Sequence, residues 1–257
     1  PTDSLRLAAP IGAAIFLSML PVTMMVPVLK QLVADRFQAA TFWTHSFMSI
    51  NMIGAVLAAP LAGALADRLG RRKPVIVIAL LVDAVLIWSM SAVATLPALL
   101  VIRFLEGAAH ILAVSTAMAV AADWADPKRR GRMMGLIGAC LIFGTACGSP
   151  LGGRIGSINP MLVFHLGAGV ALAAAVLAMI TIREAPSRKK VTKFSDALTL
   201  VVRHREMLIP YAYAFIDRFC VGVIISSFVL YLGSVQNFTP GQIGGLLSLF
   251  LFPFAFL

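Results

Sequence analysis

The sequence LAGALADRLGRRKP, residues 61–74, places five charged side chains between two long apolar segments. Each segment is long enough to cross a lipid bilayer as a helix, so the charges mark a turn between two membrane helices. Gly63 allows a second helix to approach closely, Asp67 ends the first helix with a carboxylate, and Gly70 permits a tight reversal of the chain. The stretch therefore predicts a helical hairpin that is embedded in a membrane.

The composition places the whole chain in the membrane class. Hydrophobic residues make up 60% of it and charged residues 12%, and the mean hydropathy is +0.94. A helix needs about 20 mostly apolar residues to cross the hydrocarbon core, and an open sheet could not satisfy its backbone hydrogen bonds there. We therefore expect an all-α membrane protein with eight apolar helices, at residues 8–29, 42–65, 74–94, 98–121, 133–155, 159–182, 207–234 and 240–257.

The basic residues are concentrated in alternate connections between these helices. Sixteen of the 21 lysines and arginines are Arg6 or lie within residues 68–73, 128–132 and 183–205. This asymmetry follows the positive-inside rule, which places the N-terminus and these connections in the cytoplasm. Topology thus accounts for the net charge of +10. We therefore expect the basic residues to face the lipid bilayer and not a nucleic acid. The expected location is a bacterial cytoplasmic (inner) membrane.

The longest polar stretch divides the chain into three parts. Residues 1–182 are expected to form an N-terminal six-helix bundle, and residues 207–257 the start of a second bundle. Residues 183–206 between them predict a cytoplasmic linker with a basic amphipathic helix, or a partly ordered linker. Because the chain begins at Pro1 and stops at Leu257 within an apolar run, we expect a fragment of a 12-helix protein.

Residues 63–73, GALADRLGRRK, resemble the loop signature of the major facilitator superfamily, which lies between the second and third helices of that family. The resemblance implies that Asp67 faces a helix N-terminus of the other bundle, and that Arg71 pairs with an acid ending the fourth helix, a place that Asp123 occupies. The residues of this candidate conformational latch are Gly63, Asp67, Arg68, Gly70, Arg71, Arg72 and Asp123. A solvated basic turn that only fixes the topology is the alternative.

Two further stretches resemble the same family. RFLEG, residues 103–107, is similar to its R-x-x-q-G element, with Glu106 in place of glutamine. GTACGSPLGG, residues 144–153, is similar to the helix-five signature of its proton-coupled antiporters, which implies a seal of an export-type cavity; ordinary helix packing is the alternative. The residues of this element are Gly144, Gly148, Pro150, Gly152 and Gly153. Unlike many drug exporters of the family, the first helix has no acid within residues 16–29.

A few ionisable residues lie inside the apolar windows, where each is a functional hypothesis because burying a charge in a bilayer is costly. They are Asp83, Arg103, Glu106, His110, Asp217 and Arg218. Arg103, Glu106 and His110 are spaced i, i+3 and i+7, which places them on one helix face. We expect Glu106, tuned by Arg103, to bind the coupling proton, with Asp217 or Asp83 as a second acid. A static Arg103–Glu106 ion pair and a hydrogen-bonded core histidine are the alternatives.

The sequence gives little support to an enzyme. It lacks the G-x-S-x-G, H-E-x-x-H and G-x-x-x-x-G-K-[ST] motifs, so neither a hydrolase nor an ATP-driven pump is indicated. Cys140, Cys147 and Cys220 fall within apolar windows and provide neither a disulfide framework nor the spacing of metal ligands. We expect no metal and no cofactor.

Together these features indicate a secondary active transporter that works by alternating access, in which two bundles rock about a site near the middle of the membrane. The antiporter-like element favours proton-coupled efflux of a drug-like or amphipathic compound. Proton-coupled uptake of a sugar or metabolite, and a non-transporting receptor or assembly protein, are the alternatives. The expected partners are a small-molecule substrate, protons and lipid, and the chain is expected to act as a monomer.

Overall fold

In the computed structural model, the described residues are 2–126, 128, 130–184, 206 and 208–256. Within the helices, the side chains of residues 2–7, 63, 64, 66–68, 214, 217, 218 and 254–256 are not described. The amphipathic helix expected in the linker, residues 183–206, therefore lies outside the described residues.

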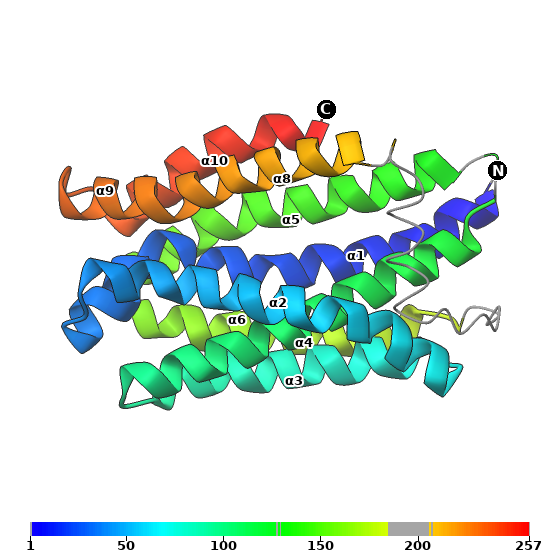
Figure 1. The fold of residues 1–257 in the computed structure, drawn as a ribbon, viewed down its shortest axis with the longest axis horizontal. Helices are drawn as coiled ribbons and strands as arrows, with labels where there is room; N and C mark the ends of the chain where they lie inside the picture. Colours follow the sequence, from blue (N-terminus) through cyan, green and yellow to red (C-terminus); the bar gives the residue numbers. More distant parts are fainter. Residues whose placement is uncertain (1, 127, 129, 185–205, 207, 257) are drawn as a thin grey trace.

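The described chain consists of helices joined by short loops and turns, and its long helices run side by side (Figure 1). The first part contains α1 (Thr2–Met24), η1 (Val26–Val28), η2 (Lys30–Asp35), α2 (Thr41–Leu69), α3 (Lys73–Ala92), α4 (Leu96–Trp124), α5 (Arg130–Ile158) and α6 (Pro160–Thr181). The second part contains α8 (Leu208–Val223), η4 (Ile224–Phe228), α9 (Val229–Ser234) and α10 (Pro240–Phe256). The expected all-α fold is confirmed.

Six segments of the described chain are long and apolar enough to cross a membrane: Ala8–Val28, which continues from α1 through η1, and one segment in each of α2 to α6. The two remaining windows, 207–234 and 240–257, are also helical, but the first contains the π-helical turn η4 and the second forms the 17-residue helix α10. The window 8–29 agrees with the candidate span Ala8–Val28, within which the α-helix α1 ends at Met24. Pro27 lacks the N–H that would continue the helical hydrogen bonding, and the chain forms the 3-10 turn η1 there.

The connections of the bundle alternate between its two ends. The N-terminus, the α2–α3 turn and the α4–α5 connection lie at one end, on the right in Figure 1, whereas the α1–α2, α3–α4, α5–α6 and α9–α10 connections lie at the other. The α2–α3 and α4–α5 connections, two of the three basic connections identified in the sequence, thus lie at the same end. Under the positive-inside rule this is the cytoplasmic end, and the opposite end is called the outer end below.

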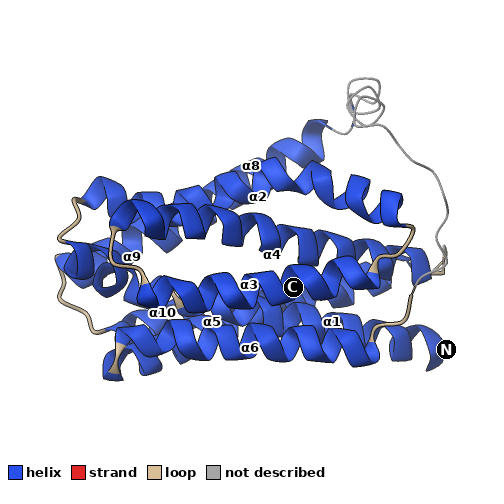
Figure 2. Ribbon diagram, turned by 90° about the horizontal axis from the view of Figure 1, so that it is seen from below, coloured by secondary structure: helices blue, strands red, loops and turns tan. Residues whose placement is uncertain are grey.

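Two clusters of buried apolar residues hold the helices together. One lies within the first part and contains residues of α1, α3, α4, α5 and α6, such as Ile15, Leu80 and Ile137. The other joins the two parts, because Val229, Leu230 and Leu232 of α9 and Ile243 and Leu247 of α10 pack with η1 and η2. None of the described residues of α8 belongs to either cluster, and the first turns of α8 project beyond the neighbouring helices (Figure 2).

The outward faces of the helices carry large apolar side chains. Val56 of α2, Val85 of α3 and Ile180 of α6 each expose more than half of their surface. In water such a continuous apolar surface would promote aggregation. It is the surface expected where helices contact acyl chains.

Arg36 fastens the α1–α2 connection to the end of α3. Its guanidinium donates to the backbone carbonyls of Met90 (2.9 Å), Ser91 (2.9 Å) and Val93 (2.5 Å) and lies over the ring of Phe37. Carbonyls at a helix C-terminus lack partners within the helix and carry partial negative charge, so they favour a cation. Partial burial lowers the pKa of Arg36, but a guanidinium stays charged at neutral pH.

We expect the Arg36→Ala substitution to destabilise the outer end, because the three carbonyls lose a charged donor. The cost should be about 2 kcal/mol, the typical net contribution of a hydrogen bond to a charged group. Thermal unfolding of the purified protein in detergent measures the change. Arg154→Ala is the matched control, since Arg154 is an exposed arginine near the outer end of α5; equal melting temperatures for the two variants would contradict the assignment.

Candidate functional site

A pair of opposite charges is buried in the first half of α4. Arg103 and Glu106 have no exposed surface, and the guanidinium Nη1 lies 2.7 Å from the carboxylate Oε2. The same Oε2 accepts a second hydrogen bond, at 2.5 Å, from the amide Nδ2 of Asn51 on α2. Glu106 is therefore held by donors from two helices.

Arg103 also contacts α1 and α2 directly. Its guanidinium carbon lies 4.8 Å from the centre of the Phe47 ring, and Nη1 lies 3.5 Å from the sulfur of Met25, just after α1. A desolvated cation over an aromatic face is stabilised by about 2 kcal/mol. The Nε and Nη2 atoms of Arg103 have no hydrogen-bond partner, so Glu106 and Phe47 are its principal electrostatic partners among the described residues.

Asp83 of α3 and His110 of α4 extend this pair into a cluster. The Asp83 carboxylate is fully buried, and its Oδ2 lies 3.5 Å from Nδ1 of His110. One donor atom from each of Asp83, Glu106 and His110 can be chosen so that all three lie within 4.8 Å of one another. The structure thus brings together four of the six ionisable residues that the sequence singled out; the side chains of the other two, Asp217 and Arg218, lie outside the described residues.

Two glycines allow the helices to approach closely enough to form the cluster. A Cβ atom on Gly107 of α4 would collide with the backbone carbonyl of Asn51, and one on Gly54 of α2 would collide with the carbonyl of Phe104. The α2–α4 contact is therefore made between backbones. Such contacts between small residues are a common way to pack membrane helices.

The sequence analysis did not identify Asn51 or Phe47 as part of the site. Asn51 is the one amide side chain in α2, so a buried amide within an apolar helix was a signal that could have pointed to it. Phe47 offered no such signal, because an aromatic residue in a membrane helix is ordinary.

We expect Gly107→Ala to separate α2 from α4 and to destabilise the protein by about 1 to 3 kcal/mol, as overpacking does. Thermal unfolding in detergent measures this change. Gly169→Ala on α6 is the control, because a Cβ there would meet no atom within 4 Å. A Gly107→Ala variant as stable as the control would show that the backbone contact is not required.

The candidate latch is only partly described. Gly70 has a φ of 60° and ends α2 in the left-handed conformation, as a tight turn requires. The side chains of Asp67 and Arg68 and the surroundings of Gly63 are not among those that the structure describes. The contact that Asp67 was expected to make with a second bundle therefore remains a prediction.

The arginine that pairs with Asp123 is Arg72, and the expected pairing through Arg71 is wrong. Arg72 occupies the N-cap position of α3, from which its side chain reaches the end of α4 and forms the ion pair, whereas Arg71 is exposed. Glu184, just after α6, accepts hydrogen bonds from the backbone N–H groups of Arg72 (2.5 Å) and Lys73 (3.3 Å). Its carboxylate caps α3, where the helix dipole favours negative charge. The sequence analysis missed this contact.

The glycines of the helix-five element pack on α1. Cβ atoms on Gly144, Gly148 and Gly152 would collide with backbone carbonyls of α1, those of Phe16, Leu20 and Met24 respectively. Their spacing of four residues places them on one face of α5. This face serves close helix packing.

The other residues of the element face α10. A Cβ on Gly153 would collide with the carbonyl of Pro240, and one on Gly244 of α10 would collide with the carbonyl of Ser149 and lie 3.2 Å from Cα of Pro150. The short stretch 149–153 therefore forms one of the contacts between the two parts of the chain, and its expected role as a seal stays a prediction.

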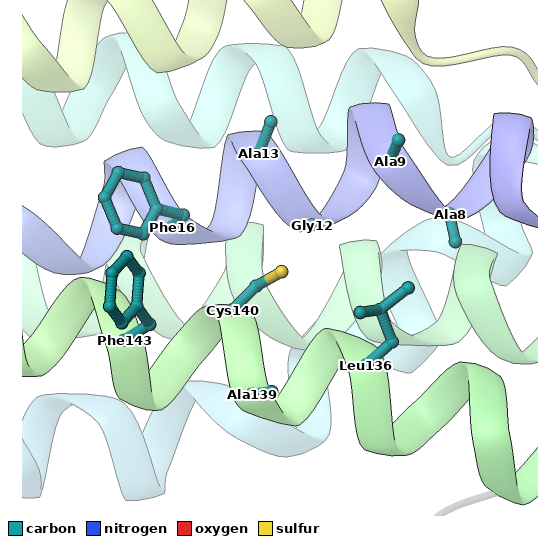
Figure 3. A pocket seen from close by; sticks show the side chains of 9 residues that line it. All are labelled: Ala8, Ala9, Gly12, Ala13, Phe16, Leu136, Ala139, Cys140 and Phe143. Carbon is teal, nitrogen blue, oxygen red and sulfur yellow. The ribbon is translucent and has the colours of Figure 1, made fainter. Parts of the chain in front are cut away.

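An apolar groove with a volume of about 610 Å³ runs between α1 and α5 (Figure 3). The rings of Phe16 and Phe143 stack beside it with their centres 5.7 Å apart, and the Cys140 sulfur points toward Gly12. Phe143 also contacts the ring edge of Phe252 on α10. The groove thus offers aromatic and small apolar surface and no charged side chain among its described lining residues.

The sequence pattern of the Major Facilitator Superfamily matches residues 11–257. The chain belongs to this superfamily. Members of the Major Facilitator Superfamily are secondary transporters that bind small molecules, so this chain is an integral membrane protein and not an enzyme. The resemblance drawn from the sequence is confirmed.

Relatives of this chain within the Major Facilitator Superfamily carry names that refer to drug resistance. Multidrug resistance protein 1 of Bacillus subtilis is 28% identical over 170 residues, which are 66% of this chain and 43% of that protein. The tetracycline resistance protein, class C, of Escherichia coli is 33% identical over 158 residues, 60% of this chain and 37% of that protein. The multi-drug resistance efflux pump PmrA of Streptococcus pneumoniae is 26% identical over 245 residues, 91% of this chain and 60% of that pump. The chain spans less than two thirds of each relative.

Proposed function

We propose that the protein is a proton-coupled transporter that exports a small apolar or amphipathic compound by alternating access. The observation that carries this proposal is the fully buried Arg103–Glu106 pair in a membrane helix. Charged groups are rare inside membrane helices, and they mark proton relays and substrate paths there. A bacterial cytoplasmic membrane is the expected location, in line with the bacterial relatives.

Glu106 is the proposed site of the coupling proton. Its Oε2 accepts hydrogen bonds from Arg103 and Asn51, whereas Oε1 is buried without a partner. A proton can therefore bond to Oε1 while the contacts of Oε2 persist. Because Asn51 belongs to α2 and Glu106 to α4, a small displacement between these helices changes how well the ionised carboxylate is stabilised. Asp83 is the proposed second acid. Asp217 remains the alternative that the sequence predicts.

Contacts between the two parts at the outer end support alternating access. There α10 packs along α5, and Nζ of Lys30 donates to the carbonyl of Gly233 at 3.3 Å. In a transporter whose two bundles rock about a central site, contacts of this kind close one end of the path.

The apolar groove supports an apolar or amphipathic substrate. A sugar or a carboxylate would require hydrogen-bonding groups in its site, and the described lining residues of the groove, such as Phe16, Leu136 and Phe143, are apolar. The names of the relatives, which refer to multidrug and tetracycline resistance, favour export.

We expect Glu106→Gln to lower transport driven by a pH gradient by about 100-fold, the scale on which a positioned proton-transfer group contributes to a rate. Exchange of labelled for unlabelled substrate, which needs no net proton movement, should persist. Both fluxes are measured with the full-length protein in proteoliposomes. Asp35→Asn, which alters an exposed acid of η2, is the control. Gradient-driven flux that survives in Glu106→Gln would exclude Glu106 as the coupling site.

We expect a bound substrate to protect Cys140 from alkylation, because its sulfur lies in the groove. The experiment uses a variant with Cys147→Ser and Cys220→Ser, a membrane-permeant maleimide, and tetraphenylphosphonium as the substrate probe. Mass spectrometry measures the labelling rate with and without the probe. The complementary variant, which keeps only Cys220, serves as the control because Cys220 is exposed on α8. Equal labelling of Cys140 in both conditions would place the substrate elsewhere.

A further inference from the structure

The buried cluster lacks one positive charge. With both carboxylates ionised and the imidazole neutral, Asp83, Glu106 and Arg103 sum to a net charge of −1. Three of the four side chains have no exposed surface. An uncompensated charge in this position is costly, because neither lipid nor bulk water neutralises it. In the buried state, the cluster therefore requires one further positive charge.

A proton fits this requirement better than a metal ion. A divalent ion between Asp83, Glu106 and His110 would change the net charge of the cluster from −1 to +1, with Arg103 close to the ion. Sodium would balance the charge, but hard cations prefer oxygen ligands, and one of the three donor atoms here is a nitrogen. A proton balances the charge and needs only one acceptor.

We propose that His110 carries this proton, as an imidazolium held by Asp83, and is the residue through which the cluster exchanges protons with its surroundings. The inference rests on the proposed function, in which Glu106 binds the coupling proton. His110 Nδ1 faces Oδ2 of Asp83, whereas the donors Arg103 and Asn51 already stabilise an ionised Glu106. Imidazole is also the side chain that ordinarily gains and loses a proton near neutral pH.

Exposure distinguishes His110 from the other members of the cluster. Its side chain keeps 12% of its surface exposed, against 0% for Asp83, Arg103 and Glu106. His110 is therefore the member of the cluster that lies nearest to the surface. The Nε2 atom is itself buried and has no hydrogen-bond partner, so a water molecule that reached it would find an open position for a proton.

The charged groups around His110 come from the two helices α3 and α4. Asp83 faces it from α3, and Arg103 and Glu106 lie on its own helix α4. Asn51 of α2 reaches Glu106 and is neutral. The described side chains of α1, residues 8–24, include no charged group, and the arginines of α5 are Arg130, Arg132 and Arg154, near the ends of that helix. The charge deficit is therefore local.

Transfer from His110 to Glu106 keeps the cluster neutral. The proton leaves an imidazolium nitrogen, which retains the electron pair, and bonds to Oε1 of Glu106, which becomes a carboxylic acid. Before the transfer, the positive charges of Arg103 and His110 balance the negative charges of Asp83 and Glu106. After the transfer only Arg103 and Asp83 are charged, and their charges balance. The step weakens the attraction between Arg103 and Glu106, so proton transfer alters the contact between α4 and its neighbours.

The test compares His110→Gln with His165→Gln in the full-length protein in proteoliposomes, with tetraphenylphosphonium as the probe. Glutamine can still hydrogen bond to Asp83 but does not titrate, and His165 is an exposed histidine of α6. We expect His110→Gln to lower gradient-driven flux by about 100-fold and to flatten its pH profile near neutrality, as loss of a proton-transfer group would. Substrate exchange should continue in both variants, which shows that the protein is folded.

Three results would overturn the inference. If Glu106→Gln abolishes gradient-driven flux while His110→Gln retains the rate and pH profile of the wild type, Glu106 exchanges its proton without His110 and the proposed function stands. If a sodium gradient at constant pH drives the flux, the missing charge is a sodium ion. If the wild type shows no flux driven by either gradient, the proposed function fails and this inference fails with it.

A measurement that does not depend on transport decides the protonation state directly. Nitrogen NMR of histidine-labelled protein at neutral pH, with the signal of His110 assigned by its loss in His110→Gln, distinguishes imidazolium from imidazole. We expect an imidazolium in the wild type and a neutral ring in Asp83→Asn. A neutral His110 in the wild type would overturn the proposal even if transport is proton-coupled.

Discussion

A charge in the interior of a bilayer has to be neutralised by the protein itself, and this constraint organises the centre of the structure. Arg103 and Glu106 neutralise each other on α4, and α2 supplies an amide and an aromatic ring to the pair. These groups reach one another only because Gly54 and Gly107 let the two backbones meet. The charge pair, its neutral partners and the glycine contacts are parts of one arrangement.

Helix α5 connects this organised bundle to the second part of the chain. One of its faces packs on α1 through Gly144, Gly148 and Gly152, and residues 149–153 meet α10. Both contacts place small residues against backbone atoms. Helices that touch in this way have few interlocking side chains to separate, so under the proposed mechanism α5 and α10 can change their mutual angle at low cost.

The turn between α2 and α3 acts as a structural junction. Gly70 reverses the chain, Arg72 joins the start of α3 to the end of α4, and Glu184 joins it to the end of α6. Three helix ends are therefore tied together at the cytoplasmic end by charges that remain near water, where they cost little. The charges inside the bundle and those at its end thus serve different purposes.

The sequence alone determined the features that depend on one helix at a time. Apolar length set the six long spans, because a helix must match the thickness of the hydrocarbon core. Helical periodicity placed Arg103, Glu106 and His110 on one face, and the family signature gave the fold.

Only the tertiary structure decided which helices meet and at which rotation. Asn51 and Phe47 complete the site because α2 packs on α4, and Asp83 joins because α3 does. The partner of Asp123 is Arg72 and not Arg71, because Arg72 stands at the N-cap of α3 beside the end of α4, whereas Arg71 lies in the preceding turn and is exposed. Contacts between helices depend on relative rotation, and no pattern within a single segment records that rotation.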